Sequence, residues 1–283
     1  MRHGIINETG DFVVPSAGTI LHKQNAELDL AVIAQDGVNV YEHRQPPHVF
    51  GLGLIELISD ETITANADPA DEDGDGISGR VSITDDGRVG RFGWKAQVPS
   101  IAEFVRDAMA AELGMTVELQ PGLTFGRLND NDDVADPEIS AEEAEDLTFF
   151  IAMLAPPPRQ PGASSAEAVA GETLFDSVGC TKCHIAALDS TAGPVPLYSD
   201  ILLHEILPPG TAGIEDTSAD MREFRTAPLW GLSQTAPYFH NGATDTVDES
   251  IRMHDGEAAT IRDAYEALDQ GDRDAILTFL ETL

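Results

Sequence analysis

The strongest constraint in the sequence is the motif Cys180-Thr-Lys-Cys183-His184, which contains both cysteines of the chain. Two thiols at this spacing reach the two vinyl groups of a porphyrin, and the following imidazole then points at the iron. The motif therefore predicts a covalently bound c-type haem. Cys180 and Cys183 would form the thioethers, and His184 would be the proximal iron ligand. The expected function is redox chemistry outside the cytoplasm.

Two other uses of the cysteine pair have to be weighed against haem. A thioredoxin-type dithiol does not require the histidine, and no strand–helix context of that kind surrounds Cys180. A zinc site would need further cysteines or a close pair of histidines. Haem is the favoured interpretation, and a redox disulfide between Cys180 and Cys183 is the alternative.

A second axial ligand of the iron should come from the residues that follow the motif. The candidates are His204, Met221, His240, Met253 and His254. Thr246 can cap a short helix that Gly256 would end, which puts Met253 and His254 near its last turn. Because one helical step rotates a side chain by about 100°, only one of these two neighbours can face the iron. The residues alone leave that choice open.

The composition excludes several classes of function. The chain has 283 residues and a formal net charge of −34, so its surface repels nucleic acids and anionic membranes. It contains no run of about eighteen apolar residues, so we expect no membrane-spanning helix. The charge either attracts a basic redox partner or keeps the protein hydrated in high salt, and the sequence does not choose between them.

A proline-rich segment divides the chain into two parts of ordinary domain size. Residues 155–165 read APPPRQPGASS, in which three prolines end one helix and small polar residues follow. We therefore expect an N-terminal domain over residues 1–155, a linker over residues 156–163 and a C-terminal domain over residues 164–283.

Helix signals flank this linker on both sides. Ser140 with Glu143 has the spacing of a capping box before an apolar stretch of helical period. Residues 166–178 have a helical pattern that leads directly into Cys180. The chain then closes with an amphipathic helix whose apolar face includes Leu280.

The two halves resemble each other, which suggests a duplicated unit. The segment RQPPHVFGL that begins at Arg44 corresponds to the segment RTAPLWGL that begins at Arg225. Each half continues with a capped helix, for which the capping pairs are Ser100 with Glu103 and Thr246 with Glu249. Only the second half contains a Cys-x-x-Cys-His motif, and the first ten residues are polar and form no export signal. We expect that a segment with an export signal and a first haem motif is missing upstream of Met1.

An acidic turn in the first half is a candidate calcium site. Asp71, Asp73 and Asp75 alternate with other residues, and Gly76 allows a sharp turn, as in the first half of an EF-hand loop. The glutamate expected at position twelve is replaced by Ser82. A solvated acidic turn is the alternative interpretation.

Seven further stretches, spread over residues 47–258, carry a family resemblance that covers nearly the whole chain. They are PHVFGLGLI (47–55), DGDGISG (73–79), GRFGWKAQVP (90–99), YSDILLH (198–204), EFRTAPLWGL (223–232), PYFHNG (237–242) and MHDGEA (253–258). With the Cys-x-x-Cys-His motif, they resemble bacterial di-haem cytochrome c peroxidases and MauG-like enzymes. The closer resemblance is to the di-haem oxidoreductases, sometimes called thiol oxidoreductases.

This resemblance implies a mainly α fold of two cytochrome c-like helical domains with long ordered loops, of which the first is incomplete. In the peroxidases, a methionine fourteen residues after the turn histidine ligates the electron-transfer haem. Here the turn histidine is His240, and the corresponding position is His254. The resemblance therefore implies that His184 and His254 ligate the iron, with Met253 as the alternative to His254.

The sequence departs from the family where the second haem should be. The family has another Cys-x-x-Cys-His motif in its N-terminal domain, and this chain has no cysteine there. Arg91, Trp94 and Gln97 would then line a haem cavity without its haem. Trp94 lies where peroxidases keep a tryptophan between the haems, so it is either an electron relay or a packing residue. Glu112 is a further candidate acid–base group.

The leading functional hypothesis is a c-type haem oxidoreductase of the di-haem peroxidase-like class. Its C-terminal haem would take electrons from a small cytochrome c or a cupredoxin. These electrons would pass towards a second haem, not encoded in this chain, that reduces peroxide or oxidises a substrate. The alternative is a non-enzymatic electron-transfer cytochrome c. Either protein would act in the periplasm or another extracytoplasmic compartment.

Overall fold

The computed structural model describes residues 1–16, 18–20, 37–129, 133–216 and 218–283. Helices make up 32% of the protein, and strands with isolated bridges make up 13%. The expected mainly α fold is therefore corrected to a mixed one, in which long loops connect short elements. Short strands form where these loops cross, because pairing satisfies backbone groups that would otherwise be buried without partners.

The helices are distributed over both halves of the chain. The described α-helices are α1 (Leu52–Glu56), α2 (Asp60–Thr64), α3 (Ile101–Asp107), α4 (Ala141–Ala152), α5 (Ala166–Val178), α6 (Val247–Arg252), α7 (Ala259–Ala267) and α8 (Gln270–Glu281). The expected helices before and after the linker and at the end of the chain are confirmed as α4, α5 and α8. Every described helix lacks the length and apolar character of a membrane span.

The strands pair antiparallel in three small sheets. They are β1 (Arg2–Ile6), β2 (Phe12–Val13), β3 (Val40–Glu42), β4 (Leu188–Ser190), β5 (Gly193–Val195), β6 (Leu203–Glu205) and β7 (Glu223–Arg225). β1 lies between β2 and β3, β4 pairs with β5, and β6 pairs with β7. In the last pair, Leu203 lies opposite Arg225 and His204 lies opposite Phe224. This pairing brings together the segments around His204 and Arg225.

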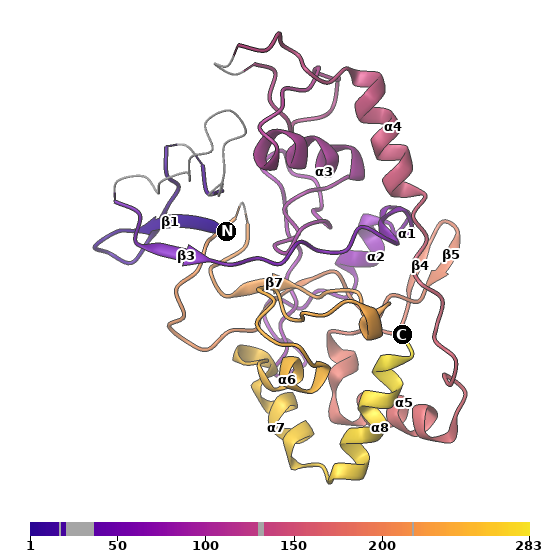
Figure 1. Ribbon diagram of the computed structural model, residues 1–283. Helices are drawn as coiled ribbons and strands as arrows, with labels where there is room; N and C mark the ends of the chain where they lie inside the picture. Colours follow the sequence, from indigo (N-terminus) through magenta and orange to yellow (C-terminus); the bar gives the residue numbers. More distant parts are fainter. Residues whose placement is uncertain (17, 21–36, 130–132, 217) are drawn as a thin grey trace.

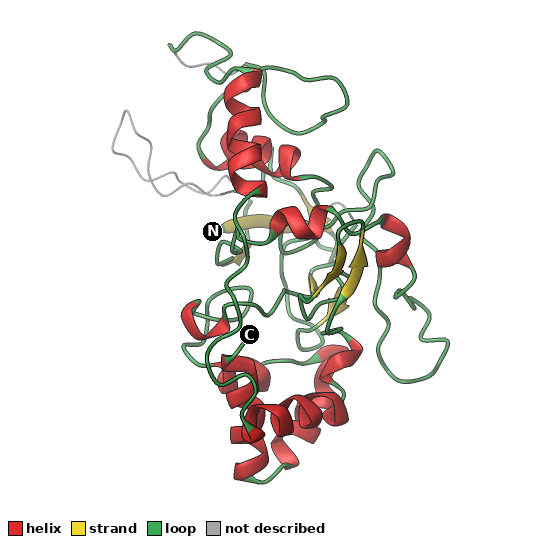
Figure 2. Ribbon diagram, turned by 90° about the vertical axis from the view of Figure 1, so that its right-hand side faces the viewer, coloured by secondary structure: helices red, strands yellow, loops and turns green. Residues whose placement is uncertain are grey.

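Two hydrophobic clusters hold the opposite ends of the molecule. Figure 1 shows α3 and α4 at one end, α5 to α8 at the other, and β7 between them, and Figure 2 shows the same division from the side. The larger cluster, around α1, α3 and α4, also contains Leu188, Leu197 and Trp230 from beyond the expected linker. The smaller cluster includes Phe175 and Phe279. Because the larger cluster draws on both sides of residues 156–163, the proposed domain bounds stay a prediction.

Close packing of α5 against α8 positions the cysteine motif. A side chain at Gly171 would meet the backbone carbonyl of Ala275, so only glycine lets the two helices approach this closely. The rings of Phe175 and Phe279 then pack with their centroids 5.5 Å apart. α5 ends at Val178, and Gly179 follows with a left-handed φ of 103° that turns the chain into the cysteine motif.

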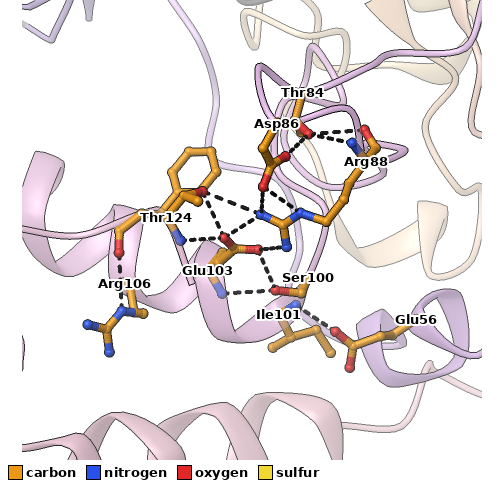
Figure 3. Close-up of polar contacts among 10 residues, drawn as sticks. Glu56, Thr84, Asp86, Arg88, Ser100, Ile101, Glu103, Arg106 and Thr124 are labelled. Atoms are coloured by element: carbon orange, nitrogen blue, oxygen red, sulfur yellow. Dashed lines mark hydrogen bonds and ion pairs between the residues drawn. The ribbon is translucent and has the colours of Figure 1, made fainter. Parts of the chain in front are cut away.

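The start of α3 is fixed by a buried carboxylate (Figure 3). The side chain of Ser100 caps the helix by accepting a hydrogen bond from the backbone N–H of Glu103 at 3.2 Å. The Glu103 carboxylate, which is fully buried, accepts two bonds from the Arg88 guanidinium at 2.7 and 2.8 Å. It also accepts a bond from the backbone N–H of Thr124 at 2.8 Å. Burial by itself would raise the pKa of Glu103, but these donors lower it, so the carboxylate stays ionised and ties the loops of Arg88 and Thr124 to α3.

We expect Glu103→Ala to lower the free energy of unfolding by about 2 kcal/mol, because it leaves Arg88 and the Thr124 N–H without their acceptor. The matched control is Glu249→Ala, which removes an exposed glutamate at the same place in the cap of α6. That change should cost only about 0.5 kcal/mol. Urea-induced unfolding of both variants measures the difference, and equal losses would contradict a special role for the buried carboxylate.

Candidate functional site

A largely apolar cavity of about 250 Å³ contains the residues that the sequence predicted to act together. Cys180, Cys183, His184 and His254 all line it, although His254 belongs to a distant segment of the chain. The apolar part of the lining includes Phe175, Leu229, Leu232, Val247, Ile251 and Leu280. The fold therefore brings two thiols and two imidazoles to one space, while their roles as ligands stay a prediction.

His184 is oriented by its own neighbourhood. Its Nδ1 lies 2.8 Å from the carbonyl oxygen of Tyr198, so Nδ1 carries the proton and donates it to this carbonyl. Burial lowers the pKa of His184 to about 4, which keeps the imidazole neutral at physiological pH. Among the described residues, Nε2 has no hydrogen-bond partner. A neutral histidine with Nδ1–H bound to a carbonyl and Nε2 free has the arrangement typical of metal ligands.

His254 has the same arrangement at the end of α6. Its Nδ1 lies 2.9 Å from the carbonyl oxygen of Ser250, one helical turn earlier, which again leaves Nε2 as the free nitrogen. Burial lowers the pKa of His254 as well. Met253 does not line the cavity. Of the two neighbours that the sequence left open, the structure thus brings His254 to the cavity.

The environment of the two cysteines disfavours thiol redox chemistry. Both are free thiols. Burial raises the pKa of Cys180 to about 12, and burial also raises the pKa of Cys183. A reactive dithiol needs a thiolate, which electropositive surroundings would have to stabilise. The structure therefore gives no support to the alternative of a redox disulfide.

The backbone segment of residues 198–200, called the strap, holds the cysteine motif in place, and the sequence did not single it out for this role. The backbone N–H groups of Ser199 and Asp200 donate to the carbonyls of Ile185 and Cys183, each at 3.0 Å. Tyr198, with φ of 51°, has a left-handed conformation that is rare for a side chain of this size. Strain of this kind persists only where the surrounding contacts over-determine it, and it concentrates at functional sites. The only advance signal was that YSDILLH belongs to the family-like stretches.

His204, one of the candidate iron ligands, is committed to a different task. Its Nε2 lies 2.8 Å from Asp200 and its Nδ1 lies 2.5 Å from Glu257, while Nδ1 is also 3.5 Å from the sulfur of Cys183. Burial by itself would lower the pKa of His204, but Asp200 raises it well above its usual value. The residue is therefore an imidazolium clamped between two carboxylates. Because both nitrogens are occupied, it cannot bind iron in this arrangement.

The remaining site candidates from the first half of the chain differ in whether they line the cavity. Trp94 lines the cavity, and its indole N–H donates to the carbonyl of Gln45. Arg91 and Gln97 do not line this cavity, and their expected place around the missing second haem stays a prediction. Arg91 instead donates to the carbonyl of Ile58 at 2.6 Å. Glu112 is exposed and lies outside the cavity lining, so the structure does not favour it as an acid–base group.

The acidic turn forms a cluster that differs in part from the expected one. Carboxylate oxygens of Asp68, Asp71 and Asp73 all lie within 4.8 Å of one another. Asp75 is not in this group, because its carboxylate pairs with the ammonium of Lys182 at 3.0 Å. The sequence therefore identified two of the three clustered residues and missed Asp68, which the EF-hand spacing does not include.

Comparison with known proteins assigns the chain to a family. A family model described as "Di-haem oxidoreductase, putative peroxidase" matches residues 22–283. The chain belongs to this di-haem oxidoreductase family. The cytochrome-c peroxidase IdrP2 of Pseudomonas sp. (strain SCT) is 28% identical over 146 residues, which are 41% of this chain and 39% of that protein. The chain thus matches well under half the length of this relative.

Two solved structures are similar over most of their length, but only distantly. One is a MauG-like protein associated with microbial copper homeostasis, with a TM-score of 0.44 and 15% identity over 86% of this chain and 93% of that one. The other is a hydrazine synthase of Kuenenia stuttgartiensis, with a TM-score of 0.38 and 17% identity over 90% of this chain and 99% of that one. Similarity at this level carries no argument about the function of this di-haem oxidoreductase family member.

The clamped imidazolium predicts a pH-dependent stability. The raised pKa of His204 means that its contribution is fully present below about pH 6.5, the unfolded value, and is lost as pH rises through the folded value. The stability difference between wild type and His204→Gln should therefore be larger at about pH 6 than at about pH 9. Urea unfolding of the haem-free chain at several pH values measures it. His43→Gln, at an exposed histidine, is the control, and a pH-independent difference for His204→Gln would contradict the prediction.

Proposed function

We propose that this chain is a c-type haem oxidoreductase that passes electrons through one haem anchored at Cys180 and Cys183. The observation that carries the proposal is the convergence of these two thiols with His184 and His254 on one apolar cavity. Family membership supports a haem cofactor independently of this geometry.

The residues around the cavity fit such a group. Aromatic and aliphatic side chains suit the faces of a porphyrin, and two neutral imidazoles with free Nε2 atoms suit its iron. When bound, the haem supplies a centre that gains and loses single electrons. The chain orients both imidazoles through the carbonyls of Tyr198 and Ser250. The strap from Tyr198 to Asp200 holds the cysteines in position. Two histidine ligands favour a lower reduction potential than a histidine–methionine pair.

The wider activity is proposed at the level of the class. We infer that electrons from a small cytochrome c or cupredoxin pass towards a second haem that reduces peroxide or oxidises a substrate. Trp94 in the cavity lining is the candidate relay. The strongly negative charge supports a basic donor, and covalent haem attachment supports a periplasmic or other extracytoplasmic location. An electron-transfer cytochrome c without enzyme activity is the second candidate, because the chain itself contains one Cys-x-x-Cys-His motif.

A structural calcium ion is a subsidiary proposal. The clustered oxygens of Asp68, Asp71 and Asp73 support it, because Ca²⁺ prefers carboxylate oxygens. The ion would offset the mutual repulsion of the three carboxylates in this turn.

Haem attachment is tested by mass. Each thiol adds its S–H across one vinyl group, so the chain matured in a haem-attaching host should gain the mass of one haem with no atoms lost. The Cys180→Ala/Cys183→Ala variant should have the mass of the bare polypeptide. A wild-type chain without added mass or a Soret band would refute the proposal.

Peroxide consumption by protein that also carries the second haem supports the enzyme. Reduction by a donor without peroxide consumption supports the carrier.

The distal ligand is tested by the reduction potential. His254→Met should raise the potential of the haem-loaded protein, because a thioether ligand favours ferrous iron relative to an imidazole. Met253→Leu, at a side chain outside the cavity lining, should leave it unchanged. Potentiometric titration monitored by absorbance measures both. A shift for Met253→Leu alone would assign the ligand to Met253.

A further inference from the structure

Arg225 is a buried cation in the cavity wall whose hydrogen bonds are incomplete. It is 6% exposed, and it lines the cavity. Its Nε donates to the carbonyl of Gly93 at 2.9 Å, and its Nη1 donates to its neighbour Thr226 at 3.2 Å. Among the described residues, Nη2 has no acceptor, and none of the ion pairs includes Arg225. A buried charge without a counter-charge is costly, so such a group usually has an anionic partner.

A second buried arginine shows what a completed set of bonds looks like in this protein. Arg106, labelled in Figure 3, is 1% exposed and also lacks a carboxylate partner. Its Nε donates to Phe125, its Nη1 to Gln120 and its Nη2 to Glu118, so every nitrogen of its guanidinium has an acceptor. Arg225 differs because one edge of its guanidinium is left for a ligand.

The cavity lining contains another unpartnered polar atom. His240, 4% exposed, lines the cavity, and its Nδ1 is buried without a hydrogen-bond partner. The His240 ring stacks on Phe224, with centroids 4.0 Å apart. The Phe224 ring also contacts the Lys95 ammonium, 3.9 Å from its centroid. A chain with a net charge of −34 thus has a buried guanidinium, a buried lysine and an unsatisfied imidazole around β7.

Nearby carboxylates do not neutralise Arg225. Asp200 is the carboxylate that acts on Arg225 electrostatically, but its two oxygens are used by His204 and by the backbone N–H of Leu202. Burial lowers the pKa of Arg225 to about 10, which still leaves it charged at physiological pH. The backbone of Arg225 is also fixed, because its N–H donates to the carbonyl of Trp94 at 2.7 Å. The guanidinium is therefore a rigid, charged donor that faces a space without an acceptor.

We propose that Arg225, together with His240 from the lining of the same cavity, forms a carboxylate-binding site for a propionate group of the porphyrin. This inference rests on the proposed haem function and adds to it the orientation of the ligand in the cavity. The propionates are the anionic part of a haem, and a guanidinium edge matches a carboxylate in shape and charge. Arg225 and His240 would then fix the polar edge of the porphyrin, while the thioethers fix another part of it.

The test uses the full chain with Cys180→Ala/Cys183→Ala, so that ligands bind without covalent attachment. Absorbance titrations compare haemin with haemin dimethyl ester, whose propionates carry no charge. With Arg225 in place, haemin should bind about tenfold more tightly than the ester, or better. Arg225→Met in the same background should abolish most of this preference while leaving the affinity for the ester nearly unchanged.

The control is Arg262→Met. Arg262 also lines the cavity, but Asp255 and Asp263 already neutralise it, so the preference for haemin should persist. Circular dichroism checks that Arg225→Met is folded. If it is not, Arg225→Lys takes its place. This variant keeps the charge and loses the planar edge, so its preference for haemin over the ester should be intermediate. Equal binding of haemin and its ester to the Arg225 chain would overturn the carboxylate site alone. Failure to bind either would overturn the proposed haem function as well, and this inference with it.

Discussion

The candidate site depends on the hydrogen bond that His184 donates to the carbonyl of Tyr198. This bond fixes the tautomer and direction of the imidazole, and it exists only because the segment from Tyr198 to Asp200 crosses the cysteine motif. The left-handed backbone at Tyr198 costs about 1–3 kcal/mol, a strain that neighbouring contacts must offset. The clamp of His204 between Asp200 and Glu257 supplies such contacts directly behind Cys183. The motif is therefore held rigidly from one side and left open on the cavity side.

Charge is distributed unevenly between the surface and the interior. The net charge of −34 makes the surface strongly acidic, whereas individual charged side chains in the interior each have a specific structural role. Glu103 joins the loops of Arg88 and Thr124 to α3, and His204 pairs with Asp200 of the strap that contacts the cysteine motif. Arg225, which lines the cavity as Trp94 does, lies on β7 without a carboxylate partner. Buried groups of this kind stabilise a protein only when fully partnered, so an unpartnered one points to a ligand.

Local signals in the sequence were reliable where they act over a few residues. The caps at Ser100, Ser140 and Thr246 are confirmed, because a cap needs only a side chain and the next helical turn. The mainly α expectation needed correction, because short strands pair, both in local hairpins such as β4 with β5 and between more distant segments such as β1 with β3. Within one family-like stretch, Trp94 lines the cavity of the cysteine motif, whereas Arg91 donates to the carbonyl of Ile58. Neighbours in a motif can face opposite sides of a loop, and spacing alone does not show this.

Residue type and short spacing in the sequence identified two thiols and an adjacent imidazole, whereas the second histidine, His254, came from the family resemblance with Met253 as its alternative. The tertiary structure decided which of Met253 and His254 faces the cavity, and it removed His204 from the candidate ligands. It also revealed Arg225 as a charged group without a partner. The physical reason is that the roles of buried polar groups depend on long-range contacts. The same histidine or arginine side chain can form an ion pair, pack in a core or bind a ligand, and its tertiary contacts decide which of these roles it has.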